Sequence, residues 1–345
     1  MTTEVKKIIS PSTPIRAVAL LSGGLDSTLA IRLMLKQGIS VTAVNFTSPF
    51  CTCSPRRGGC HLASEVARTF GVELRVLTKG EDYLEIVRNP RHGHGRGLNP
   101  CIDCRIYMLH KVASLMDSLG AQFVVTGEVL GQRPMSQHLQ AMKIIEKESG
   151  LEGKILRPLS AQLLEPTLPE LNGWVDRKAL LAIAGRSRRE QLALAQAENL
   201  EVFSCGSGGC LLTDKVIAAR LRDVFEHQTK VSLTDARLCT LGRHLRLSPT
   251  LKIVLGRDES ENDRLKRLAP ELPWAELIGA PGPTAIICGA LDESGKVNLA
   301  RILRHYSPKA HGCVPMMIRF VDRVEQLITS TAAAEREIKG WWIEP

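Results

Sequence analysis

A short run of small and polar residues near the start of the chain carries the strongest chemical signal. Residues 22–27 read SGGLDS; they follow the apolar stretch 16–21 and precede a stretch with helical periodicity, 28–37. A glycine-rich turn between a buried strand and a helix suits phosphate, because the backbone comes close to the ligand and the helix N-terminus offers unpaired N–H groups. No lysine follows the glycines, so the spacing differs from the triphosphate loop GxxxxGK[ST]. The alternative is a tight turn in which Asp26 and Ser27 only cap the helix.

Two cysteines three positions apart carry the second signal. Cys101 and Cys104 follow Pro100, and residues 102–119 have the pattern of a long amphipathic helix. A thiol at a helix N-terminus has a lowered pKa, and its thiolate is both a nucleophile and a metal ligand. The pair is therefore a candidate for sulfur chemistry or for sharing one metal ion.

The remaining cysteines form looser groups. Ten cysteines in a chain that begins without a signal-peptide core argue against a disulfide framework. One group follows the second predicted strand and would form a further metal site or a sulfur relay; it consists of Cys51, Cys53 and Cys60. Two more flank a Gly-rich turn, Cys205 and Cys210. The scattered thiols are expected to be buried spare residues, namely Cys239, Cys288 and Cys313.

Alternating strands and helices must position these residues. Strands are predicted over 16–21, 41–46, 73–77 and 123–126, and helices over 28–37, 62–70 and 102–119. Such alternation favours a parallel sheet covered by helices, with ligands beyond the carboxyl ends of the strands. The segments 22–27, 45–47 and 126–128 should then line one crevice. The basic loop 91–97 is expected to close over a substrate; the alternative is that His92 and His94 bind metal or phosphate.

These motifs resemble those of a known enzyme family. SGGxDS resembles the PP-loop of the ATP pyrophosphatases, which adenylate a substrate oxygen and release pyrophosphate. Residues 99–104, NPCIDC, resemble the NPCxxC segment of the tRNA thiouridylases, which are PP-loop enzymes. Residues 124–128, VVTGE, are similar to their ATGH segment, with Glu128 in place of histidine, which leaves the role of Glu128 open.

The resemblance implies an α/β fold, a parallel sheet with helices on both faces of the PP-loop or HUP-like adenine nucleotide hydrolase type. It also implies a third cysteine downstream, for which Cys210 fits better than Cys205. Three cysteines would hold a [4Fe–4S] cluster, or carry and resolve a persulfide; the alternative is a zinc site completed by a histidine or another cysteine. The catalytic residues would be Asp26, Cys101, Cys104 and Cys210. The ATP-binding residues would be Ser22, Gly23, Gly24, Leu25, Asp26, Ser27, Asn45, Phe46, Thr126 and Gly127.

The C-terminal third has a different motif content. The order of Gly242-Arg243-His244, a charged helix after Gly256, Trp274 and a Pro-Gly turn resembles the RNA-binding domain of the NFACT proteins, over residues 240–320. For residues 240–320 the alternative is a small α+β domain with ordinary surface arginines. For Arg188 and Arg189, which lie earlier in the chain, the alternative is the solvated start of a helix. The predicted RNA contacts are Arg186, Arg188, Arg189, Arg243, Arg246 and Arg257.

Composition sets the remaining expectations. A formal net charge of +9 over 345 residues suits a polyanionic partner, and an aromatic content of 4% favours phosphate contacts over base stacking. We expect a cytoplasmic protein with three parts: a PP-loop domain over 1–180, a helical extension with the third cysteine over 181–232, and a smaller α+β domain over 233–345.

The resemblance implies an ATP-dependent tRNA sulfurtransferase that makes thiouridine, and the loop, the thiols and the charge are compatible with that activity. It would use ATP, Mg²⁺ and a [4Fe–4S] cluster or a persulfide, with a cysteine desulfurase or free sulfide as sulfur donor. Three rivals stay open: a small-molecule sulfur transferase, which would not need the basic C-terminal domain; an amide-forming PP-loop ligase, which would not need the cysteines; and a non-catalytic RNA-binding protein.

Overall fold

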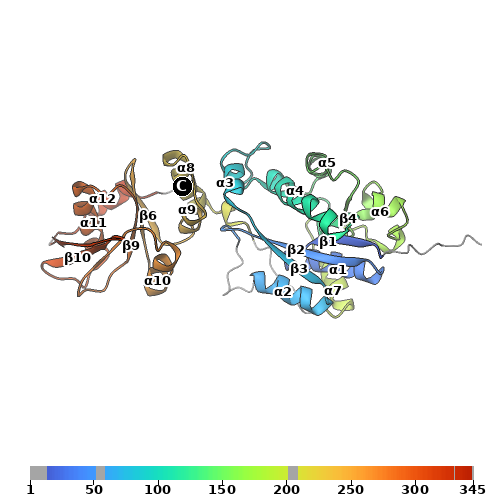
Figure 1. Ribbon diagram of the computed structural model, residues 1–345, viewed down its shortest axis with the longest axis horizontal. Coiled ribbons are helices and arrows are strands. Elements are labelled where there is room, and N and C mark those ends of the chain that lie inside the picture. The colour runs from blue at the N-terminus through green and yellow to red at the C-terminus, as the bar shows by residue number, and fades with distance from the viewer. Residues whose placement is uncertain (1–13, 52–58, 201–208, 330, 344–345) are drawn as a thin grey trace, which may run out of the picture. The chain divides into compact units, whose positions relative to one another are not determined.

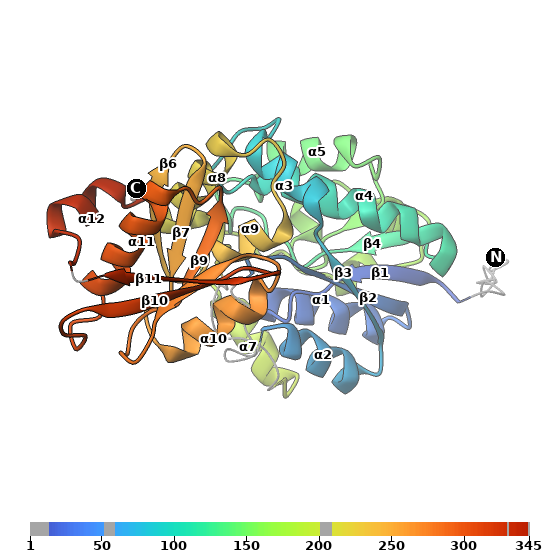
Figure 2. The same ribbon diagram turned by 60° about the vertical axis from the view of Figure 1, so that its left-hand side comes forward.

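The computed structural model describes residues 14–51, 59–200, 209–329 and 331–343, with no account of the side chains of 59 and 60. The chain folds into two compact units (Figures 1 and 2). The first comprises residues 1–95 and 100–209, and the second comprises 96–99 and 210–345. The predicted extension over 181–232 is therefore divided, since residues 181–209 belong to the first unit and 210–232 to the second.

The first unit is built on a parallel sheet in the order β3-β2-β1-β4-β5. Its strands are β1 (Arg16–Leu20), β2 (Ser40–Thr47), β3 (Glu73–Thr78), β4 (Phe123–Val125) and β5 (Ile155–Leu156). Chain order reverses beside β1, because β2 pairs with one edge of β1 and β4 with the other. This switch point places the ends of β1, β2 and β4 side by side, where open α/β sheets bind ligands.

Helices cover both faces of this sheet, as the sequence predicts. Figure 1 shows α1 (Leu25–Lys36), α2 (Gly59–Phe70) and α7 (Arg189–Ala197) on one face, and α3 (Glu81–Arg88), α4 (Cys101–Leu119) and α5 (Leu139–Glu148) on the other. β1 alternates between two cores: Ala17 and Ala19 pack with Ile31 of α1, and Val18 packs with Val112 of α4. The short α6 (Leu168–Leu171) and the 3-10 turns η2 (Ala161–Leu163) and η3 (Arg177–Ala179) precede α7.

The second unit is an antiparallel sheet with helices on both faces. The strand order is β11-β10-β8-β9-β7-β6. The strands are β6 (Arg243–Ser248), β7 (Leu251–Leu255), β8 (Trp274–Leu277), β9 (Ala285–Gly289), β10 (Val314–Arg319) and β11 (Val324–Thr329). The helices are η4 (Leu211–Thr213), α8 (Lys215–His227), α9 (Leu233–Leu238), α10 (Glu259–Leu268), α11 (Glu293–His305) and α12 (Glu335–Trp341).

Two cores also alternate along β7 in this unit. Ile253 packs with Leu303 of α11, whereas Val254 packs with Leu265 of α10. The charged helix predicted after Gly256 is confirmed as α10, whereas α11, α12, β10 and β11 were not expected from the sequence. Among the described residues, no helix is both long and apolar enough to cross a bilayer.

Candidate active site

The loop between β1 and α1 has the geometry that its glycines predict. Gly23 adopts a positive φ of 73°, and a Cβ there would lie 2.9 Å from the backbone nitrogen of Ala63. Gly127, just after β4, touches the loop from the other side: a Cβ on it would lie 2.4 Å from the Ser27 nitrogen. Only glycine allows both approaches. The loop is thus held between α2 and the end of β4.

Hydroxyl groups close the loop on itself. Ser22 Oγ and Ser27 Oγ lie 3.1 Å apart, and Ser27 Oγ donates to the Gly24 carbonyl at 2.9 Å. Gly24 is the N-cap of α1 without a side-chain cap, and Leu25 is the first helical residue. Uncapped N–H groups at a helix N-terminus are an anion site. The start of α1 thus has no side-chain cap, and phosphate binding by residues 22–27 stays a prediction.

Polar side chains from two segments, 132–133 and 188–191, surround the carboxyl group of Asp26. Its Oδ2 lies 3.7 Å from Arg188 NH2, just before α7. Burial raises the pKa of Asp26, opposed by Arg188, by Arg133 and by the side-chain amides of Gln132 and Gln191. Arg188, predicted to contact RNA, thus lies beside the loop aspartate.

The ends of β2 and β4 supply the other residues predicted for ATP. Asn45 is buried and donates from Nδ2 to the Leu21 carbonyl at 2.7 Å, so it braces the start of the loop. Phe46 follows it on β2 and packs into the core under α4. Thr126 donates from its hydroxyl to Glu128 at 3.3 Å. The switch point thus gathers the segments 22–27, 45–46 and 126–127, as the sequence predicts.

Glu128 belongs to a buried ion network. Its two carboxylate oxygens lie 3.2 Å from Arg105 Nε and 3.0 Å from Arg157 Nε. Arg157 is 3% exposed and also pairs with Glu146. Against the opposing effect of burial, the two arginines lower the pKa of Glu128. Glu128 therefore ties β4 to α4 and to the end of β5, and it holds Arg105 in place next to the cysteine pair.

The cysteine pair lies at the N-terminus of α4, as predicted. Cys101 is the first helical residue, and the Cys104 N–H donates to the Pro100 carbonyl at 2.7 Å. Lys79 projects from the end of β3, and its Nζ donates to Cys104 Sγ at 2.9 Å. The guanidinium of Arg133 interacts electrostatically with both Cys101 and Asp26. The positive charge of Arg133 therefore acts on both the loop 22–27 and the cysteine pair.

The basic loop 91–97 is anchored at its start. Both oxygens of the Asp103 carboxylate accept hydrogen bonds from this loop, from Arg91 N at 2.9 Å and from His92 N at 3.1 Å. His92 Nε2 lies 3.1 Å from Glu148, and His94 Nε2 lies 2.7 Å from the Val87 carbonyl. Asp103, which lies between the two cysteines, therefore fixes the start of the loop 91–97 through its two hydrogen bonds to the backbone.

Cys210 belongs to the second unit. It precedes η4, whose Leu212 carbonyl accepts a hydrogen bond from Leu98 N at 2.9 Å. Gly97 packs directly on the same carbonyl: a Cβ on Gly97 would lie 2.2 Å from its oxygen, so only glycine fits there. Residues 96–99, which lead to Cys101, therefore pack within the second unit against the turn that follows Cys210.

No three His, Cys, Asp or Glu side chains gather as a metal site within the part of the chain that the structure describes. Cys53 and Cys205 lie outside that part, as does the side chain of Cys60. The proposed second site with Cys51 and the competition between Cys205 and Cys210 thus stay predictions. Of the scattered thiols, Cys239 and Cys288 are buried as predicted, whereas Cys313 is exposed, so the prediction of a buried thiol there is wrong.

The arginines predicted to contact RNA differ in their surroundings. Arg246 forms a two-pronged pair with Asp223, at 2.9 and 2.6 Å, and Arg257 pairs with Glu261. Arg243 lies over the Tyr306 ring at 4.9 Å. Arg186 and Arg189 are exposed. RNA contact by these residues stays a prediction, and Arg246 and Arg257 also have structural roles.

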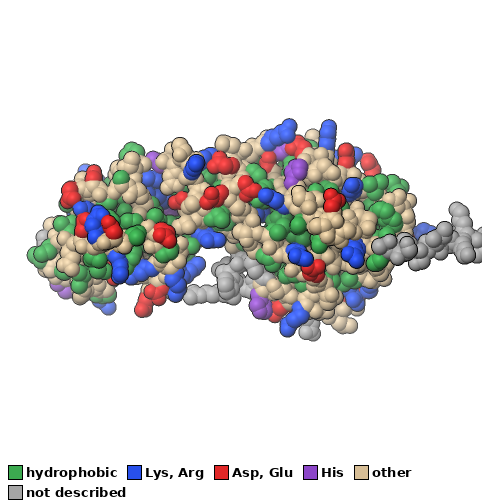
Figure 3. Space-filling model, viewed as in Figure 1, with side chains coloured by type: hydrophobic (Ala, Val, Ile, Leu, Met, Phe, Trp, Pro, Cys, Tyr) green, Lys and Arg blue, Asp and Glu red, His purple; other side chains and the backbone are tan. Residues whose placement is uncertain are grey.

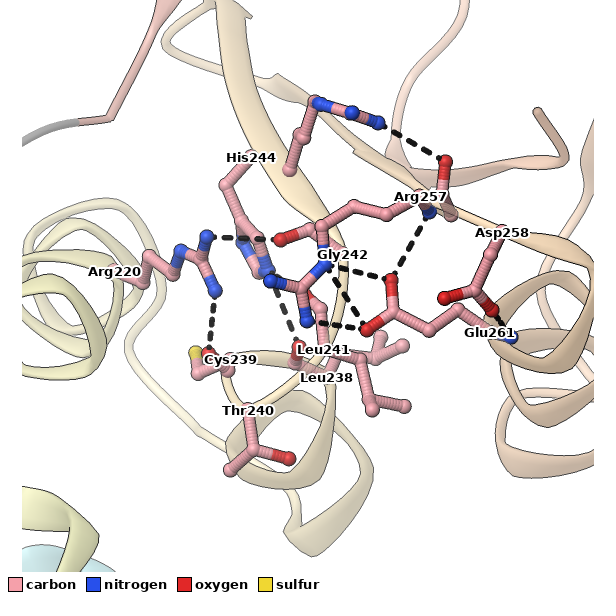
Figure 4. A network of polar contacts seen from close by, with 12 residues as sticks. Arg220, Leu238, Cys239, Thr240, Leu241, Gly242, His244, Arg257, Asp258 and Glu261 are labelled. Carbon is pink, nitrogen blue, oxygen red and sulfur yellow. Dashed lines mark hydrogen bonds and ion pairs between the residues drawn. The ribbon is translucent and has the colours of Figure 1, made fainter.

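A polar network holds the GRH segment of the second unit (Figure 4). His244 Nε2 lies 2.9 Å from the Leu241 carbonyl, and Arg220 donates to the carbonyls of Cys239 and Gly242. Burial lowers the pKa of His244 well below its usual range, with the cations Lys252 and Arg220 adding to the effect. His244 is therefore a neutral structural residue that fixes the turn between α9 and β6.

The sequence analysis missed three residues that lie beside the loop 22–27 and the cysteine pair. Lys79 is a single lysine at the end of a strand, and Arg105 directly follows the CxxC motif. Gln191 is fully buried on α7. Gln191 could have been found as a polar residue on the apolar face of a helix. The sequence around Lys79 contains no comparable signal.

Two family models match separate parts of the chain. Residues 12–162 match the family described as thiamine biosynthesis protein (ThiI), and residues 242–342 match the NFACT protein RNA binding domain. The resemblances to the PP-loop thiouridylases and to the NFACT RNA-binding domain are thereby confirmed, each for its own part of the chain.

Individual relatives agree with this assignment over the first part. The chain is 33% identical over 146 residues to a probable tRNA sulfurtransferase of Methanothermobacter thermautotrophicus, covering 42% of this chain and 36% of that protein. It is 34% identical over 117 residues to the tRNA-specific 2-thiouridylase MnmA of Syntrophotalea carbinolica, covering 31% and 32%. The chain thus spans about a third of the length of these curated relatives.

A solved structure of a 4-thiouridine synthetase–RNA complex with bound ATP is 29% identical to the chain, with a TM-score of 0.34. The match covers 42% of this chain and 37% of that one.

Proposed function

We propose that the chain is an ATP-dependent tRNA sulfurtransferase, which activates a base carbonyl oxygen by adenylation and replaces it with sulfur. The observation that carries the proposal is the link between two sites in the first unit. The loop 22–27 follows β1, and Lys79 at the end of β3 donates to Cys104 Sγ at 2.9 Å, so the loop and the cysteine pair lie at the same edge of the parallel sheet. Nucleotide binding without sulfur chemistry would give the cysteines no role there.

Adenylation would use the loop and the arginines around it. The base oxygen attacks the α-phosphorus of ATP, and the bond to the β-phosphate oxygen breaks. The free N–H groups at the start of α1, with Arg133 and Arg188, would stabilise the charge that develops on the departing pyrophosphate. Asp26 Oδ1 is buried, and the Asp26 carboxylate has the side-chain amides of Gln132 and Gln191 as neighbours, so it could hold a Mg²⁺ ion, which would neutralise phosphate charge.

Sulfur transfer would follow at the N-terminus of α4. The sulfur attacks the activated carbon, the carbon–oxygen bond breaks, and AMP leaves with the former base oxygen. Cys101 and Cys104 are proposed as the cysteines that deliver the sulfur, with Cys210 as the third.

Iron content separates the two proposed sulfur carriers. A cluster requires iron at about four per chain in anaerobically purified protein, lost in Cys101→Ala but kept in Cys239→Ala, whose thiol is fully buried. An iron-free enzyme that still thiolates RNA would favour a persulfide, which a second cysteine resolves as a disulfide for an external thiol to reduce. Stoichiometric zinc without iron would contradict both.

The second unit is proposed to bind the tRNA. Lys and Arg side chains gather over α10 in Figure 3, and Arg264 and Arg267 of that helix are exposed. Unlike Arg246 and Arg257, these two have no carboxylate partner within the ion pairs of the described residues. Phosphate contacts of this kind predict binding that weakens steeply with salt.

Pyrophosphate release tests the proposal. The wild-type chain should release pyrophosphate from ATP when its tRNA is present, and Asp26→Ala should abolish release without unfolding the protein. Asp117→Ala, an exposed aspartate on α4, is the matched control and should leave release unchanged. RNA-independent release would instead favour the small-molecule sulfur transferase.

A further inference from the structure

Gln191 is a buried residue that packing does not explain. It lies on α7, which packs against α1, and its side chain is 0% exposed. Neither Nε2 nor Oε1 forms a hydrogen bond of regular geometry with another residue that the structure describes, and its polar neighbour is the carboxyl group of Asp26. A buried amide without partners destabilises a fold, and an apolar side chain of the same shape avoids that cost. The amide of Gln191 therefore contributes little to the stability of the ligand-free fold.

The surroundings of Gln191 show where its amide is directed. The carboxyl group of Asp26 interacts with the side-chain amides of both Gln191 and Gln132. Asp26 Oδ1 and Gln132 Nε2 are also buried and without a hydrogen-bond partner among the described residues. Three buried polar groups without hydrogen bonds of regular geometry, from α1, α7 and the segment after β4, thus converge beside the loop 22–27.

The charges around this cluster define the chemistry of its ligand. Arg188 NH2 lies 3.7 Å from Asp26, and Arg133 interacts with the same carboxylate. The free N–H groups at the start of α1 add to the positive potential. Two guanidinium groups and a helix N-terminus favour an anion with several negative charges, whereas carboxylate and amide oxygens favour a hard divalent cation. A magnesium complex of pyrophosphate combines both demands.

We propose that Gln191 contacts the magnesium-bound pyrophosphate moiety of ATP, so that α7 is part of the nucleotide site. The inference rests on the proposed function for the presence of ATP in this site. Its amide supplies one donor for a phosphate oxygen and one acceptor for the hydrated metal. Arg188 provides the charge on the same side of the loop, in place of the RNA contact predicted for it.

Binding of magnesium pyrophosphate to the full chain tests this inference. Gln191→Met replaces the amide by an apolar side chain of similar length, and Gln191→Ala removes it altogether. Titration calorimetry should show the affinity of both variants for magnesium pyrophosphate reduced about tenfold or more, as expected when a buried polar contact to a charged group is lost. The ligand-free Gln191→Met protein should melt at the wild-type temperature or above it.

The control is Gln196→Met, which makes the same change at an exposed position of the same helix and should bind like wild type. Wild-type affinity in both Gln191 variants would overturn the inference, as would a wild-type chain that does not bind magnesium pyrophosphate. The assay needs no RNA and no sulfur. A chain that binds pyrophosphate through Gln191 but does not thiolate tRNA would refute the proposed function and leave this inference standing.

Discussion

Removing the charge of Glu128 should destabilise the first unit strongly. Glu128 is 1% exposed and pairs with Arg105 and Arg157, the latter 3% exposed. The change Glu128→Gln keeps the shape of the side chain and one oxygen that accepts from Arg157. It leaves the buried Arg157 with Glu146 as its remaining carboxylate partner, and it leaves Arg105 without an ion pair to any other described residue.

The magnitude follows from burial. Breaking a buried ion pair by neutralising one partner costs about 3–5 kcal/mol, because the other charge stays desolvated. Arg157 keeps Glu146, so we expect the lower end, about 3 kcal/mol. The matched control is Glu165→Gln, which breaks an exposed 3.0 Å pair with Lys143 and should cost about 1 kcal/mol or less.

The effect should also depend on pH. Because Arg105 and Arg157 hold the pKa of Glu128 below its usual range against the effect of burial, its charged form stabilises the fold at and above the ordinary carboxyl pKa. That contribution is lost as the pH falls through the lowered pKa. The difference in the free energy of unfolding between wild type and Glu128→Gln should therefore reach its full value at pH 7 and should shrink below about pH 4.

Amide hydrogen exchange measures the loss of stability in the first unit separately from the second. The amides of Val124 and Thr126, which donate across β4 and β5, should exchange about a hundredfold faster in Glu128→Gln at pH 7, the factor that about 3 kcal/mol provides. Exchange rates equal to those of Glu165→Gln would refute the argument, since Glu128 would then act as an exposed carboxylate.

Three further predictions concern single residues. Gly127→Ala should abolish ATP binding, because its Cβ would lie 2.4 Å from the loop nitrogen of Ser27; Gly340→Ala, where nothing lies within 4 Å, is the control, and ATP binding by Gly127→Ala would contradict the loop geometry. Burial raises the pKa of Cys288 to about 12, so iodoacetamide at pH 8 should label the exposed Cys313 and leave Cys288 unmodified until unfolding; equal labelling in mass spectrometry would contradict its burial. Burial also holds His244 neutral, so the second unit should lose up to about 1.4 kcal/mol for each pH unit below about 6.5, and a pH-independent stability there would contradict that role.

The sequence predicted the first fold well because its signals are local. Apolar runs such as 16–21 and 123–126 are too short for helices and are bounded by turn residues. The order of strand, loop and helix along the chain could therefore be predicted. The glycine loop and the helix that starts at Cys101 are also local features. Because parallel strands end at one edge, the meeting of segments 22–27 and 126–127 could be inferred without coordinates.

The rest depended on contacts between distant residues. Arg188 lies beside Asp26 because α7 packs on α1, a tertiary contact that no local pattern encodes. Arg246 pairs with Asp223 across 23 positions, and Lys79 reaches Cys104 from another strand. A basic residue alone does not indicate whether its partner is a phosphate or a carboxylate of the same chain.

The sulfur-containing nucleosides of tRNA provide the most direct test of the central claim. Mass spectrometry should show one thiolated uridine missing from a strain in which the gene is deleted. It should return with the wild-type chain and stay absent with Asp26→Ala or Cys101→Ala. An unchanged set of thionucleosides in the deletion strain would contradict the assignment of this chain as a tRNA sulfurtransferase.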